Sequence, residues 1–128
     1  MRQRVPGAIA FLVAVTGATA VAFGAFGAHA LRTRIGADAL AVWHTGVEYH
    51  FWHALALLVA AVGLPEGRWR KVALALFPLG ILLFSGSLYA LALGAPRWTG
   101  AITPFGGLCF IAGWLALGGA LIRGRGAG

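Results

Sequence analysis

The amino-acid sequence predicts an all-α integral membrane protein, a four-helix bundle with both termini in the cytoplasm. Hydrophobic residues make up 60% of the 128 residues and charged residues only 10%, and the mean hydropathy is +0.86. This composition excludes a soluble domain. The apolar residues form four runs, each long enough for the roughly 20 residues that cross a 30 Å hydrocarbon core. Basic residues gather at the ends of these runs, where they orient spans rather than bind nucleic acid.

We expect one domain over residues 1–128, with helices at about 6–31, 39–62, 69–93 and 104–122. The first helix begins at Pro6, because the missing N–H of proline is no loss in a first turn. Its apolar run is too long for a cleaved signal peptide. The second helix follows Asp38, a favourable N-cap residue, and ends at the Gly- and Pro-containing segment 63–67.

The third helix contains Pro78, which removes a backbone hydrogen bond and is expected to bend the helix. Gly94 and Pro96 end it, and residues 97–102 form the last connection. Thr103 followed by Pro104 is typical of an N-cap and first helical residue, and predicts the start of the fourth helix.

The distribution of basic residues predicts the orientation. With four spans, one side of the membrane receives seven basic residues: Arg2, Arg4, Arg68, Arg70, Lys71, Arg123 and Arg125. The other side receives three: Arg32, Arg34 and Arg97. By the positive-inside rule, both termini are cytoplasmic and the protein is a multi-pass inner (plasma) membrane protein.

Polar residues from all four helices are expected in the half of the bilayer away from the cytoplasm. They are His29, Glu48, His53, Ser85, Ser87, Tyr89 and Thr103. A charged residue inside the bilayer costs roughly 2.5 to 3.5 kcal/mol, so such groups face partners, a cavity or a function. We therefore predict that the seven side chains form an outer-leaflet ligand-binding cluster. The alternative is that each simply hydrogen-bonds a neighbouring helix, with Glu48 protonated.

The second helix does not hold a metal site by itself. At 100° per residue, His44 and Glu48 lie about 40° apart on one face, and His50 and His53 lie about 60° apart on another. Glu48 and His53 point roughly 140° away from each other. His29, Glu48 and His53 are consequently only weak metal candidates, and the single Cys109 adds no ligand pair.

Nothing in the sequence predicts an enzyme. No nucleophile and base form a recognisable pattern, and there is no nucleotide-binding loop, CxxC or HExxH motif.

Four ordered motifs resemble a known family. They are Gly24-Ala25-Phe26-Gly27-Ala28-His29, Glu48-Tyr49 with His53-Ala54-Leu55-Ala56, Leu83-Phe84-Ser85-Gly86-Ser87-Leu88-Tyr89, and Ile102-Thr103-Pro104 with Gly106-Gly107 and Gly113-Trp114. The chain resembles the YgdD-like family of small membrane proteins, which contain the domain of unknown function 423. The resemblance covers nearly the whole chain and implies a four-helix inner-membrane protein without an assigned activity. It includes the seven candidate residues, but not His44 or His50.

We therefore expect a non-enzymatic membrane protein whose polar cluster binds a small ligand, a metal, or a lipid or quinone headgroup. The sequence identifies no cofactor. One alternative is a proton or ion pathway through Glu48 and His53. Another is a structural accessory subunit of a larger membrane complex or a homo-oligomer, because small residues recur every fourth position at Ala20, Gly24, Ala28 and at Ala112, Ala116, Ala120.

Overall fold

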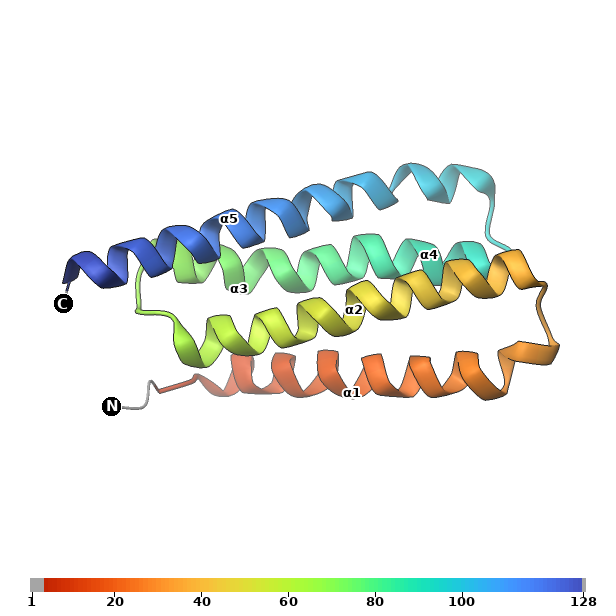
Figure 1. The fold of residues 1–128 in the computed structure, drawn as a ribbon, viewed down its shortest axis with the longest axis horizontal. Coiled ribbons are helices and arrows are strands. Elements are labelled where there is room, and N and C mark those ends of the chain that lie inside the picture. Colours follow the sequence, from red (N-terminus) through yellow and green to blue (C-terminus); the bar gives the residue numbers. More distant parts are fainter. Residues whose placement is uncertain (1–3, 128) are drawn as a thin grey trace.

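Four long helical rods lie side by side in the computed structural model, which describes residues 4–127 (Figure 1). Three rods are α1 (Gly7–His29), α2 (Ala37–Gly63) and α5 (Thr103–Ala127). The remaining rod joins α3 (Arg68–Gly80), the π-helical turn η2 (Ile81–Ser85) and α4 (Gly86–Ala92). The prediction of an all-α chain with four long helices is confirmed.

The rods follow the chain order across the molecule. α2 packs against α1 on one side and against the α3–η2–α4 rod on the other, and α5 packs on that rod (Figure 1). Both ends of the chain and the α2–α3 connection lie at one end of the molecule, here called the terminal end. The opposite end, here called the connection end, holds the short 3₁₀ helices η1 (Leu31–Thr33) and η3 (Arg97–Ala101).

Three helical stretches of the described residues are long and apolar enough to span a bilayer: Gly7–Thr33, Arg68–Ala92 and Arg97–Gly124. α2 is the exception, although it is 27 residues long. Its half nearer the connection end contains His44, Thr45, Glu48 and His50, and these lower its hydropathy. That all four rods cross the membrane remains a prediction.

The helix boundaries agree with those expected to within a few residues, except that α5 continues to Ala127. Two expected caps are wrong. Gly36 is the N-cap residue of α2, and Asp38 lies inside its first turn. The Thr103 hydroxyl is 2.6 Å from the hydroxyl of Ser87, so it links two rods. Residues 97–101, expected as a loop, form the 3₁₀ helix η3.

The α3–η2–α4 rod and α5 cross very closely. Pro78 cannot donate a backbone hydrogen bond, and the π-helical turn begins three residues later at Ile81. At the crossing, a Cβ atom on Gly106 would lie 2.3 Å from the backbone nitrogen of Phe84. Only glycine permits this approach.

A buried arginine closes the terminal end of α2. The Arg70 side chain, at the start of α3, is 6% exposed. Its Nε and Nη2 atoms donate hydrogen bonds to the carbonyl oxygens of Ala60 (3.3 Å) and Ala61 (3.0 Å). These carbonyls lie in the last turn of α2, whose partial negative charge a guanidinium stabilises.

Candidate functional site

Thr19, His50 and Tyr89 form a hydrogen-bonded chain that links α1, α2 and α4. The Thr19 hydroxyl donates to the carbonyl oxygen of Val15 at 2.7 Å, so it accepts from His50 Nε2–H at 3.1 Å. The Tyr89 hydroxyl then donates to His50 Nδ1 at 2.8 Å. Both ring nitrogens of the neutral imidazole are satisfied, and the Tyr89 oxygen keeps lone pairs that can accept another hydrogen bond.

His53 links α2 to α5 in a similar way. Its Nδ1–H donates to the carbonyl oxygen of Tyr49 (2.8 Å), and its Nε2 accepts from the indole N–H of Trp114 (2.9 Å). The ring also stacks on Phe110, with the centroids 3.6 Å apart. His53 is thus a buried bridge between two helices, with no free ring nitrogen.

The two serines of the candidate set form hydrogen bonds at other contacts between helices. The Ser85 hydroxyl, fully buried, donates to the carbonyl oxygen of Gly46 on α2 at 2.6 Å. The Ser87 hydroxyl bonds Phe84 O at 2.9 Å and meets the Thr103 hydroxyl on α5. Each hydroxyl satisfies a group at its own packing seam, as is common inside membrane bundles.

The remaining two candidates, His29 and Glu48, are exposed on the outside of the bundle. His29 is the last residue of α1, whereas Glu48 lies about 16 Å along α2 from Ala37 at 1.5 Å per residue. None of the side-chain hydrogen bonds found in the described residues engages the Glu48 carboxylate.

The structure does not bring the seven predicted residues together in one chamber. Their polar atoms are divided among separate seams and the outer surface, because each helix crossing has its own donors and acceptors to satisfy. Among residues 4–127, no three His, Cys, Asp or Glu side chains are placed to hold a metal ion. His29, Glu48 and His53 thus do not form the weak metal site considered above. Glu48 is exposed on the outside of the bundle, whereas both ring nitrogens of His53 are bonded inside it, so the two side chains do not face each other.

Glu48 belongs to an exposed strip of α2, here called the outward face of α2. It comprises Ala37, Ala41, His44, Thr45, Glu48 and Trp52, all exposed. The six positions fall within about 100° of the helix circumference at 100° per residue. Small residues lie at intervals of four, and a carboxylate and an imidazole lie one turn apart. This face has no partner within residues 4–127.

A largely apolar groove runs between α1 and the α3–η2–α4 rod, with His50 of α2 at its floor. Its volume is about 510 Å³, and its lining residues include Leu12, Thr19, Phe23, Leu82, Gly86 and Tyr89. A second hollow of about 540 Å³ shares Phe23 and Tyr89 and continues toward Trp43 and Leu93. Of the seven predicted site residues, only Tyr89 lines either hollow.

His50 is the polar residue that sequence reasoning set aside, although it lies at the centre of the bundle with 3% exposure. A signal for it was present in the sequence. Trp43, Gly46, His50, Ala54 and Leu57 recur at intervals of three and four, and all are buried on one face of α2. A histidine within such an apolar strip points inward, whereas Glu48 lies off it.

Comparisons with known proteins agree about the class. The family model described as "Protein of unknown function (DUF423)" matches residues 23–107. The inner membrane protein YgdD of Escherichia coli K12, described as UPF0382, is 46% identical over 114 residues, which cover 84% of this chain and 85% of YgdD. The UPF0382 membrane protein YwdK of Bacillus subtilis is 43% identical over 115 residues, covering 83% of this chain and 89% of YwdK. No solved structure is significantly similar to this chain.

Proposed function

Since the chain belongs to the DUF423 (UPF0382) family of multi-pass inner-membrane proteins, we propose that it is a non-enzymatic assembly protein. In this proposal it associates with a second copy of itself through the outward face of α2. The observation that carries the proposal is the exposed carboxylate of Glu48, well inside a helix that packs among membrane spans.

The length of α2 sets the depth of Glu48 in the membrane. A 27-residue helix is about 40 Å long and exceeds a hydrocarbon core of about 30 Å by roughly 5 Å at each end. Glu48, about 16 Å from the helix start, then lies roughly 11 Å inside the hydrocarbon. Facing lipid there costs an ionised carboxylate roughly 2.5 to 3.5 kcal/mol, and a hydrogen-bonding partner from another chain offsets that cost.

A second copy of the chain can supply the hydrogen-bonding partner that Glu48 lacks in the monomer. Two copies inserted in the same orientation are related by an axis along the bilayer normal, so their α2 helices run parallel. If the helices cross between residues 44 and 48, each His44 approaches Glu48 of the other copy, and the interface is self-complementary. Ala37, Ala41 and Thr45 present small side chains on the same face, which permits close backbone approach.

Cysteine cross-linking in native membranes tests this proposal. With the only cysteine removed by Cys109→Ala, Thr45→Cys on the outward face is expected to give a covalent dimer upon mild oxidation. Leu115→Cys, 73% exposed on α5, is the control and is expected to stay monomeric. Adding Glu48→Leu should weaken the association about tenfold, the loss of a 1–2 kcal/mol interhelical hydrogen bond. A Thr45→Cys protein that stays monomeric, or that cross-links only to a different protein, would contradict the proposal.

The groove between α1 and the α3–η2–α4 rod supports a second candidate function, the binding of a lipid-soluble ligand. Its walls are largely apolar, and the polar atoms left with free capacity are acceptors, the hydroxyl oxygens of Thr16, Thr19 and Tyr89. That chemistry fits a ligand whose headgroup donates a hydrogen bond, such as a quinol or a long-chain alcohol, better than an oxidised quinone, which only accepts.

A ligand in this groove is expected to depend on the Tyr89 oxygen. A short-chain quinol should raise the melting temperature of the purified wild-type protein, and Tyr89→Phe should abolish most of that rise. Tyr49→Phe is the matched control, because its ring lies outside both hollows. An equal rise in all three proteins would rule out this site.

A further inference from the structure

A basic pocket lies at the terminal end, far from the groove and from the outward face of α2. Its volume is about 520 Å³, and it is enclosed by the α2–α3 connection, the first turn of α3 and the end of α5. The lining residues are Pro65, Glu66, Gly67, Arg68, Trp69, Arg70, Ala120, Arg123 and Gly124. None of them lines the groove beside α1 or belongs to the outward face of α2.

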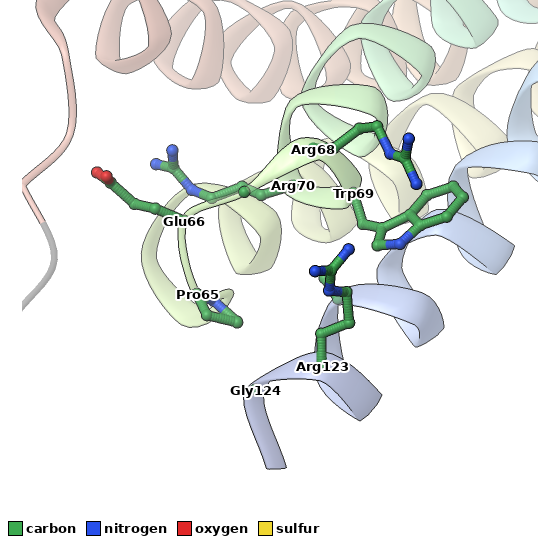
Figure 2. A pocket seen from close by; sticks show the side chains of 9 residues that line it. Pro65, Glu66, Arg68, Trp69, Arg70, Arg123 and Gly124 are labelled. Atoms are coloured by element: carbon green, nitrogen blue, oxygen red, sulfur yellow. The ribbon is translucent and has the colours of Figure 1, made fainter. Parts of the chain in front are cut away.

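Two arginines are available to a ligand in this pocket. Figure 2 shows the guanidinium groups of Arg68 and Arg123 on either side of the Trp69 indole. The Arg68 Cζ atom lies 5.0 Å from the centre of the Trp69 ring. Arg70 points away toward the end of α2, where its guanidinium caps Ala60 and Ala61. Glu66, the one acidic residue of the lining, points away from Arg123 (Figure 2).

The backbone adds to the positive potential of the pocket. The N-cap residue of α3 is Gly67, with φ +153°, and no side chain caps this helix end. There is also no acidic residue in its first turn. The free amides and the partial positive charge of the 13-residue helix α3 thus face the same space as Arg68. A phosphate oxygen is the acceptor that such a combination of amides and guanidinium groups prefers.

An apolar groove lies beside the pocket, along the seam between α3 and α5, and shares Trp69 with it. It holds about 280 Å³ and is lined by Trp69, Val72, Leu76, Ala112, Leu115, Ala116 and Gly119. Trp69 belongs to both the basic pocket and this groove and packs over Gly119, where an added Cβ would lie 3.5 Å from the indole. A basic headgroup site beside an apolar groove matches the two ends of a phospholipid.

We propose that the terminal-end pocket binds the phosphate group of an anionic membrane lipid, with one acyl chain lying in the groove between α3 and α5. Arg68, Arg123 and the first amides of α3 hold the phosphate, and Trp69 lies at the boundary between headgroup and chain. The apolar groove favours a lipid over free phosphate, because a free phosphate ion has no apolar chain to place in the groove. The inference does not depend on the self-association proposed above.

Native mass spectrometry of the full-length protein in detergent tests the proposal with phosphatidylglycerol and phosphatidylcholine as probes. The wild-type protein should bind phosphatidylglycerol about tenfold more tightly than phosphatidylcholine. The double variant Arg68→Gln/Arg123→Gln should lose about 25-fold in phosphatidylglycerol affinity, about fivefold for each arginine.

The control removes the same charge from the same end without touching the pocket. Arg4→Gln/Lys71→Gln changes two exposed basic residues outside the lining and should alter the affinity by less than about twofold. Equal losses in both double variants would show general attraction to the membrane surface and overturn the pocket. Displacement of the lipid by millimolar inorganic phosphate would overturn the assignment to a lipid.

Discussion

Gly106 shows at the scale of one residue how closely the bundle is packed. Its absent side chain leaves room for the backbone at Phe84, so a Cβ there must displace main-chain atoms rather than a flexible side chain. Gly118, on the same helix, has nothing within 4 Å of the position where a Cβ would lie. The two glycines therefore separate the effect of packing from that of helix propensity.

We expect Gly106→Ala to destabilise the protein by about 1 to 3 kcal/mol, the usual cost of overpacking a core. Gly118→Ala should be neutral or stabilise it by up to about 1 kcal/mol, because alanine favours the helix over glycine. Reversible unfolding in mixed detergent micelles, followed by circular dichroism, measures both changes. Equal stabilities of the two variants would contradict the close crossing.

The sequence predicts the polar residues better than it predicts their partners. The estimate that Glu48 and His53 point about 140° apart agrees with one being exposed and the other buried. It could not reveal that Trp114 bonds His53 or that Tyr89 bonds His50, because these pairs depend on the rotation and depth of other helices. A single hydroxyl can bond many different backbone and side-chain groups in a helix bundle. Polar residues at the same depth in the membrane therefore need not line the same chamber.

At the scale of elements, the prolines, glycines and charged residues that separate the apolar runs were sufficient to locate the four helices. Local chemistry at their ends was harder, because a threonine before a proline can cap its own helix or bond a neighbour. Thr103 does the second, since Ser87 lies within 2.6 Å. Pro78 predicted a disturbance in the third rod, but the sequence does not distinguish a kink from the π-helical turn that follows at Ile81–Ser85.

For the whole molecule, the unequal charge of the two ends supports the proposed orientation. Arg4, Arg68, Lys71 and Arg123 are exposed at the terminal end, and Arg32, Arg34 and Arg97 at the connection end. Together with Arg2 and Arg125, which lie beyond the described side chains, this distribution favours a cytoplasmic terminal end.

In a Cys109→Ala background, we expect Arg34→Cys to react with a membrane-impermeant maleimide in intact spheroplasts. Glu66→Cys, in the α2–α3 connection at the other end, should react only after the membrane is permeabilised. Both positions are exposed, so access to the reagent and not burial decides the labelling. The reverse pattern would invert the orientation, and labelling of both from outside would mean that α2 does not cross.

The order of packing partners also bears on how the chain is built into the membrane during translation. α1 contacts the remainder of the molecule almost solely through α2, the very next helix to leave the ribosome. The α3–η2–α4 rod instead packs most extensively against α5 and must wait, with Gly80 and Phe84 uncovered, until the last helix has been synthesised. The vulnerable interval in biogenesis is therefore the synthesis of the chain after Ala92, and nascent chains stalled there should be the preferred targets of membrane quality control.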